Sequence, residues 1–397
     1  MKPQSPAVDD LVRRAQNAMA QRRPAEAAEL WARIAALAPD HPQAKLQIAI
    51  AQLNIAFARR QAGDMDGELG AYNNALAADP LCYPALLGKA ALLERLGKAR
   101  QAAKIYRDAL KLEPPRDQLP PALAAQFDEA RQAVQADSRR MSDYLRERLG
   151  AERAQAGEQD LRRFDACVGV VAGTREVYTV KPTLLHFPAL PAIEFYDNES
   201  FPLLAALEAQ SDFILEELTV LLREDAGGFN PYVNKPAGTP LNQWAELNAS
   251  PQWSAFFLWE DGKPIEQNCR RCPKTAALLE ASGMADVPGY APTAFFSLLK
   301  PHTHIPPHTG VTNTRLIVHL PLIVPEKCRF RVGGETRDWE QGKAWVFDDT
   351  IEHEAWNDSD RTRVILIFDV WNPFLTEPER KLIGPLLQGV DAYYRSE

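Results

Sequence analysis

A 34-residue repeat in the first third of the chain limits its fold more than any other feature. The repeated residues are Tyr72, Ala75, Leu76 and Pro80, which recur 34 positions later as Tyr106, Ala109, Leu110 and Pro114, while Gly63 recurs as Gly97. A small residue between two helices and a proline that closes the second helix predict a two-helix unit. Such units bury a continuous core only by stacking on one another. The sequence therefore predicts a stacked helical array.

An earlier copy of the pattern extends this array toward the N-terminus. Trp31, Ala35 and Pro39 precede the next copy by 41 positions rather than 34, so we expect a longer helix over 43–62. About three copies of this length resemble tetratricopeptide repeats, which we place at 8–116. Such arrays often present a groove to a peptide or protein partner, here a substrate recruited by the repeats. A mere packing or dimerisation platform is an equal alternative.

Paired prolines close the array and introduce a second region. Pro114-Pro115 and Pro120-Pro121 are helix-ending signals. Residues 117–164 are rich in Ala, Gln, Arg and Glu, and we interpret them as a helical connector with a solvated surface.

Bulk composition restricts the classes of partner. A chain of 397 residues is too long for one ordinary core, so two or three domains are expected. The net charge of −8 and the pI of 5.6 favour no nucleic-acid partner. No apolar run reaches the roughly 18 residues of a membrane span, and residues 1–10 lack a secretory signal. We therefore expect a cytoplasmic protein with reduced thiols, in which Cys269 and Cys272 are packing or surface residues rather than a zinc or redox pair.

The chain becomes rich in strands after the connector, and we place the third domain at 165–390. We expect a short strand at 168–171 and one helix over 201–222. The further predicted strands are 253–259, 293–299, 314–324, 328–332, 336–339, 344–347, 353–356 and 363–371. Short strands that follow helices predict an α+β chain ending in a β-sandwich or a jelly-roll barrel.

Side-chain alternation predicts a polar pocket on two of these strands. Neighbouring strand residues point to opposite faces, so Arg315, Ile317 and His319 share one face, and Arg363 shares a face with Asp369. An arginine within an apolar strand is costly unless it meets a carboxylate. That carboxylate belongs either to the protein, which is the simpler interpretation, or to a ligand.

The distribution of histidines adds a metal to this hypothesis. His308 precedes an apolar strand, His353 begins a later strand, and Arg363 follows on the next one. Two imidazoles on separate strands are typical of a ferrous oxygenase site, which leaves positions open for a 2-oxo acid and dioxygen.

Residues from about 170 to 390 resemble the aspartyl/asparaginyl β-hydroxylase family of iron(II)- and 2-oxoglutarate-dependent oxygenases. The matching segments are Pro307-His308-Thr309-Gly310, Thr312-Asn313, Arg315-Leu316, Phe347-Asp348-Asp349, Glu352-His353-Glu354, Trp356, Asp369-Val370-Trp371, Pro373 and the segment 268–275. The family fold is a double-stranded β-helix, a cupin-like jelly roll. Its animal members carry tetratricopeptide-like repeats before it, which is similar to the layout of this chain.

The resemblance implies a role for each matched residue. His308 and His353 would bind Fe(II). Arg363 and Ser297 would bind the distal carboxylate of 2-oxoglutarate, and His319 would lie beside the carboxylate nearer the metal. Dioxygen is the remaining cosubstrate that the resemblance implies.

Two positions of this sequence depart from the residues found in related oxygenases. Gly310 stands two residues after His308, where most such oxygenases carry a carboxylate ligand, and this absence is the family's own habit. Ile317 replaces an arginine that holds the metal-proximal carboxylate in animal members. Arg315 or another cation would have to compensate for it.

The leading functional hypothesis is hydroxylation of an Asp- or Asn-type residue in a peptide or protein. The first alternative is a hydroxylase of a small-molecule or lipid-linked substrate on the same fold. The second is a non-enzymatic repeat scaffold with a degenerate barrel. Retention of His308, His353, Arg363 and Ser297 favours the two enzymatic hypotheses.

Overall fold

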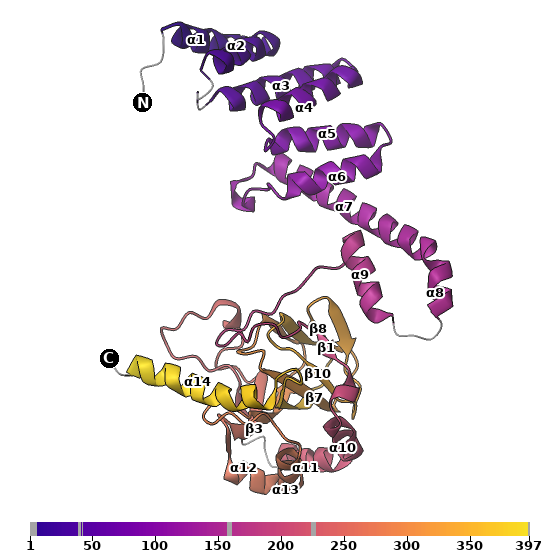
Figure 1. Ribbon diagram of the computed structural model, residues 1–397, viewed down its shortest axis with the longest axis vertical. Coiled ribbons are helices and arrows are strands. Elements are labelled where there is room, and N and C mark those ends of the chain that lie inside the picture. Colours follow the sequence, from indigo (N-terminus) through magenta and orange to yellow (C-terminus); the bar gives the residue numbers. More distant parts are fainter. Residues whose placement is uncertain (1–5, 39–40, 42, 157–160, 224–227, 396–397) are drawn as a thin grey trace. The chain divides into compact units, whose positions relative to one another are not determined.

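The computed structural model describes residues 6–38, 41, 43–156, 161–223 and 228–395 (Figure 1). The chain divides into two compact units, Met1–Arg175 and Glu176–Glu397. Within the described ranges, no helix has both the length and the apolar character that crossing a bilayer would require.

The first unit is entirely helical, and each helix of the array packs on the next one along the chain. Its helices are α1 (Pro6–Ala20), α2 (Pro24–Leu37), α3 (Ala44–Gln61), α4 (Met65–Ala78), α5 (Tyr83–Arg95), α6 (Ala99–Leu110), α7 (Pro121–Arg148), α8 (Gly150–Ala156) and α9 (Arg162–Ala172). The tetratricopeptide-like array predicted from the 34-residue period is confirmed by this arrangement.

The repeated glycines have a conformational cause. Gly63 and Gly97 follow the first helix of a pair with φ of 71° and 73°, in the left-handed region that glycine adopts without strain. The side chain of Asp64 then accepts a hydrogen bond from the Gly67 backbone and begins α4. Gly88 of α5 leaves room for the ring of Tyr72, which a Cβ at that position would overlap.

Other details of the first unit refine the sequence-based expectations. Helix α3 has 18 residues against 13 in α5, which accounts for five of the seven extra residues in the first period. Pro39 lies outside the described residues. The strand predicted at 168–171 is wrong, because this apolar segment forms part of α9, which packs on α7 and ends at Gly173. The predicted third domain, 165–390, thus begins inside α9, and the division of the chain lies after Arg175.

The second unit contains two antiparallel sheets. Its strands are β1 (Phe195–Tyr196), β2 (Asn230–Pro231), β3 (Trp253–Glu260), β4 (Lys263–Pro264), β5 (Ala294–Leu299), β6 (Thr303–His308), β7 (Arg315–Ile323), β8 (Cys328–Val332), β9 (Glu335–Asp338), β10 (Trp345–Phe347), β11 (His353–Asn357) and β12 (Arg363–Trp371). The larger sheet has the order β1-β10-β7-β12-β5-β3-β2, with β4 beside β3, and the smaller one has the order β6-β11-β8-β9. The predicted α+β chain with a C-terminal jelly roll is confirmed.

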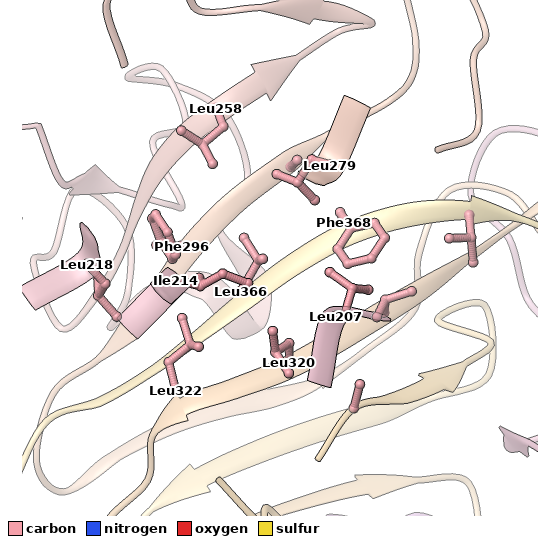
Figure 2. Close-up of a cluster of buried hydrophobic side chains, with 14 of the residues drawn as sticks. Leu207, Ile214, Leu218, Leu258, Leu279, Phe296, Leu320, Leu322, Leu366 and Phe368 are labelled. Carbon is pink, nitrogen blue, oxygen red and sulfur yellow. The ribbon is translucent and has the colours of Figure 1, made fainter. Parts of the chain in front are cut away.

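Helices cover one face of the larger sheet. They are α10 (Leu203–Ala209), α11 (Ser211–Arg223), α12 (Glu266–Arg271) and α13 (Pro273–Ala281), whereas α14 (Glu377–Arg395) packs in a separate cluster with Val287 and Ala291. The single helix predicted over 201–222 is two helices that part at Gln210. Figure 2 shows Leu207, Ile214 and Leu218 of these helices in the same cluster of buried side chains as Leu320 and Phe368 of the sheet. Cys272 is buried in this cluster as a free thiol, which fits a packing role.

The opposite face of the larger sheet packs against the smaller sheet. Phe347 and Ile365 of the first share a buried cluster with Ile305, Phe330 and Ala355 of the second. Leu316, Val318, Leu320 and Leu322 of β7 point toward the helices, so its alternate residues Ile317 and His319 point between the sheets. The alternation predicted for β7 and β12 is therefore confirmed, and it puts polar side chains inside the barrel.

Candidate active site

His308 and His353 lie opposite each other on paired strands. His308 is the last residue of β6, His353 is the first of β11, and the two are direct partners in the antiparallel ladder. Their ring centroids are 4.0 Å apart. The side chain of His353 is buried and that of His308 is partly buried. The structure thus brings together the two histidines that the family resemblance assigns to iron.

Backbone carbonyls set the tautomer of both rings. Nδ1 of His308 donates to the carbonyl of Pro306 over 2.8 Å, and Nδ1 of His353 donates to that of Ile351 over 3.0 Å. Each Nδ1 carries a proton because a carbonyl only accepts, so each Nε2 keeps its lone pair. Burial lowers the pKa of both imidazoles, for His353 well below its usual range. Neutral rings that are held through Nδ1 and free at Nε2 fit a divalent transition metal.

The described part of the chain provides no third protein ligand beside the pair. Among the residues that the structure describes, no group of three His, Cys, Asp or Glu side chains is arranged to hold a metal ion. A Cβ on Gly310 would overlap the carboxylate of Asp349, so Asp349 takes the space of a side chain at position 310. Its Oδ1 is buried without a hydrogen-bond partner, and burial raises the pKa of this carboxyl to about 8. The residues therefore fit a two-histidine site with a carboxyl group close by.

Arg363 lies deep inside the barrel without a carboxylate partner. Its side chain is 1% exposed, and no Asp or Glu lies within ion-pair distance of it among the described residues. Its Nη1 donates to the carbonyl and the Oγ of Ser297, both over 3.3 Å, while its Nε has no acceptor within the described ranges. The guanidinium lies 4.7 Å from the ring centre of Trp339. Burial lowers the pKa of Arg363 to about 10, so it stays a cation at neutral pH.

An unpaired cation of this kind is costly unless an anion binds it, because desolvation is not offset by an internal partner. A ligand carboxylate would supply a bidentate partner. A carboxylate partner could come from the protein or from a ligand. For Arg363, the described residues leave only the ligand as its source. For Arg315 the structure provides an internal one.

His319 lines the same cavity as His308, His353 and Arg363. It is 4% exposed, its Nδ1 has no hydrogen-bond partner among the described residues, and its ring packs 4.7 Å from that of Phe347. Burial, with the charge of Arg363, lowers the pKa of His319 well below its usual range. A neutral imidazole with an unused ring nitrogen remains available to a ligand at this position. Ile317 lines the same cavity but offers no polar atom.

Arg315 forms an ion pair with Asp369, its neighbour on β12. The carboxylate of Asp369 also accepts a hydrogen bond from the backbone of Thr293 over 2.8 Å. The Arg315 side chain keeps 16% of its surface exposed, on the wall of the cavity. The structure therefore gives Arg315 an internal partner, whereas its compensation for Ile317 stays a prediction.

One cavity of about 430 Å³ contains every predicted site residue. Its polar lining includes Ser297, His308, Arg315, His319, Asp349, His353, Arg363 and Asp369. A volume of this size falls within the usual range of small-ligand pockets. All its lining residues come from the second unit.

Sequence reasoning did not single out the aromatic wall of this cavity. Tyr232 stacks on Trp253 with ring centres 4.1 Å apart, and Trp244 packs edge-on against His308 at 5.0 Å. From the sequence, Tyr232 is a candidate substrate-contacting residue of a Gly- and Pro-rich loop over 225–240, and Trp253 is only part of the strand predicted at 253–259. Their roles depend on how a loop folds over a sheet, for which a single sequence gives no periodic signal.

Comparison with known proteins extends this picture. Residues 208–373 match the family model described as aspartyl/asparaginyl beta-hydroxylase. This part of the chain is therefore similar to the aspartyl/asparaginyl β-hydroxylase family. A Mus musculus protein with the name "Aspartyl/asparaginyl beta-hydroxylase" is 42% identical over 151 residues, which are 38% of this chain and 20% of that protein.

Two further relatives align over a longer part of the chain. The "Ornithine lipid ester-linked acyl 2-hydroxylase" of Rhizobium tropici is 38% identical over 189 residues, 47% of this chain and 62% of that protein. The human "Aspartate beta-hydroxylase domain-containing protein 2" is 30% identical over 208 residues, 51% of this chain and 54% of that protein. The chain thus spans between a fifth and about three fifths of the length of these relatives.

Proposed function

We propose that the second unit is an iron(II)- and 2-oxoglutarate-dependent dioxygenase that hydroxylates an Asp- or Asn-type residue of a peptide or protein. The observation that carries this proposal is Arg363, a buried cation without an internal carboxylate, in the same cavity as two histidines with free Nε2 atoms. The match of residues 208–373 to the aspartyl/asparaginyl beta-hydroxylase family model supports hydroxylase chemistry.

Each residue has a distinct part in this mechanism. The Nε2 atoms of His308 and His353 would hold Fe(II), which supplies the oxidising chemistry when 2-oxoglutarate and dioxygen are bound. Arg363 and Ser297 would bind the distal carboxylate and fix the direction of the cosubstrate. His319 would donate a hydrogen bond to the carboxylate nearer the metal. The surrounding aromatic side chains exclude water from the reacting groups.

A turnover assay tests this proposal. We expect the purified chain with Fe(II) to convert 2-oxoglutarate to succinate, and Arg363→Met to lose this activity by a large factor. Arg329→Met is the matched control, because Arg329 also lies over a tryptophan ring, at 5.0 Å, but half-exposed on the outer side of β8. Equal turnover by wild type and Arg363→Met would refute the assignment of Arg363.

A second substrate class is favoured by one comparison. The 38% identical relative of Rhizobium tropici is named as a hydroxylase of an ester-linked acyl chain of a lipid. The alternative is therefore a small-molecule or lipid-linked substrate. Mass spectrometry of cell extract treated with wild type or His353→Ala separates the classes. A +16 Da shift on a protein residue supports the first, and the same shift confined to lipids or metabolites supports the second.

A further inference from the structure

We propose that Trp253 is a positioning residue for the distal carboxylate of the cosubstrate. Its indole N–H holds the Oγ of Ser297 so that the hydroxyl proton of Ser297 points into the cavity. This inference rests on the proposed function, since it concerns the same carboxylate that Arg363 would bind.

The hydrogen bonds around Ser297 lead to this conclusion. Nε1 of Trp253 donates to Oγ of Ser297 over 3.1 Å, and Nη1 of Arg363 donates to the same oxygen over 3.3 Å. A serine hydroxyl has two acceptor lone pairs and one proton. The two donors thus occupy both lone pairs of the Ser297 Oγ. The O–H bond has to point in the one direction around this oxygen that is left. Ser297 is 1% exposed and its hydroxyl meets no acceptor among the described residues, so a ligand would have to accept this proton.

The sheet register brings Trp253 to this oxygen. Trp253 of β3 pairs with Leu299 of β5, and Ser297 pairs with Ala255, so Trp253 and Ser297 are diagonal neighbours on the cavity face. Long side chains reach across such a diagonal. Stacking on Tyr232 at 4.1 Å and packing against Trp244 at 6.0 Å restrict the plane of the indole ring. The N–H direction is therefore set before any ligand enters.

The consequence is a preorganised pair of donors. A carboxylate that meets Arg363 would find the Ser297 proton already aimed at it, which avoids the cost of rotating the hydroxyl on binding. Without the indole N–H, one Oγ lone pair becomes free and the hydroxyl gains other orientations. Losing one neutral hydrogen bond of this type corresponds to a change in affinity of about three- to tenfold.

Two variants separate this role from simple packing. Trp253→Phe keeps an aromatic ring at the stack but removes the N–H. Trp345→Phe is the control, because Nε1 of Trp345 is buried without a partner among the described residues, and this side chain does not line the cavity. Ser297→Ala and the double variant Trp253→Phe/Ser297→Ala complete a double-mutant cycle.

The experiment is an anaerobic calorimetric titration of the full-length, iron(II)-loaded chain with two ligands. 2-Oxoglutarate carries the distal carboxylate, and 2-oxopentanoate has the same carbon chain without it. We expect Trp253→Phe to weaken 2-oxoglutarate binding about three- to tenfold while 2-oxopentanoate binding stays unchanged. The double variant should bind 2-oxoglutarate no more weakly than Ser297→Ala, and Trp345→Phe should match wild type.

Three results would overturn the inference while leaving the proposed function intact. They are wild-type affinity in Trp253→Phe, an equal loss for both ligands, or additive losses in the double variant. If the wild type itself binds 2-oxoglutarate no better than 2-oxopentanoate, the proposed function and this inference both fail.

Discussion

At the scale of residues, we expect Arg363 to lower the stability of the fold and to bind 2-oxoglutarate. Its guanidinium is fully buried, and its partners are the neutral groups of Ser297 and the ring of Trp339. Replacing a buried charge with an apolar side chain of similar volume often stabilises a fold. We expect Arg363→Met to raise the free energy of unfolding of the metal-free protein by about 1 kcal/mol or more.

Denaturant unfolding of the metal-free protein measures this effect, with Arg329→Met as the control. The combination of higher stability and lost 2-oxoglutarate binding would identify Arg363 as a functional cation. A fall in stability by several kcal/mol would instead show that Arg363 is a structural residue that the fold requires.

The Asp349 carboxylate fills the space that a side chain at position 310 would need. A Cβ at position 310 would overlap the Asp349 carboxylate, and overpacking of this kind usually costs about 1–3 kcal/mol. We therefore expect Gly310→Ala to destabilise the second unit by about that amount. The same substitution in an Asp349→Ala background should cost little, because the overlapping atoms are gone.

Chemical denaturation of the four proteins in this cycle measures the coupling between the two positions. Additive effects would contradict the account, since they would mean that the two side chains do not compete for space.

At the scale of elements, the strands β6, β7 and β11 each place one histidine in the barrel, namely His308, His319 and His353. Burial lowers the pKa of each below the unfolded value of 6.5. Below pH 6.5 the unfolded chain therefore binds protons that the folded chain does not, and stability falls as the pH falls. Asp349, with its raised pKa of about 8, acts in the opposite direction, so the histidine contribution is best measured as a difference.

We expect His319→Asn to lose stability less steeply than wild type between pH 6.5 and 5 in the metal-free protein. One group contributes up to about 1.4 kcal/mol per pH unit, which is the size of the expected difference in slope. Urea midpoints at several pH values provide the measurement. Parallel curves for the two proteins over this interval would contradict the burial of a neutral His319.

Strand alternation was the part of the site that the sequence predicted best. The sequence of β7 and β12 placed Arg315, His319 and Arg363 on the inner faces because a buried strand has a period of two. It did not predict β6, since Pro306-Pro307 is an unusual pair within a strand. The proximity of His308 and His353 follows from the β6–β11 ladder, so it could not be derived without that strand.

Contacts that depend on three-dimensional packing were not predictable. Asp349 was recognised within a matching segment, but its fit against Gly310 follows from the approach of two loops. The hydrogen bond from Trp253 to Ser297 requires the register of β3 and β5. By contrast, the helical array followed directly from a period in the sequence, since each repeat contacts mainly its neighbours.

At the scale of the whole molecule, the candidate active site belongs to the second unit. All residues that line the cavity lie between Tyr232 and Asp369. We therefore expect residues 176–397 alone to bind iron(II) and to retain 2-oxoglutarate turnover in the absence of a prime substrate. For this test the chain is better truncated after residue 175 than after residue 115, where the array ends. Truncation after residue 115 would separate α7 from the array, against which it buries Phe127 and Ala130.

The same truncation tests the role proposed for the repeats. If the array recruits a protein substrate, hydroxylation of that substrate should fall on truncation while uncoupled turnover remains. Equal hydroxylation with and without the array would leave packing or dimerisation as its role.

The most direct test of the two-histidine site is the amount of iron that the full-length chain binds. Anaerobic equilibrium dialysis against iron(II) and 2-oxoglutarate should give one iron per chain for wild type and none for His308→Ala or His353→Ala. His304→Ala is the matched control, because His304 also lies on β6 but faces outward against Trp356 and Glu354. It should bind one iron. Undiminished iron in both His308→Ala and His353→Ala would contradict the account.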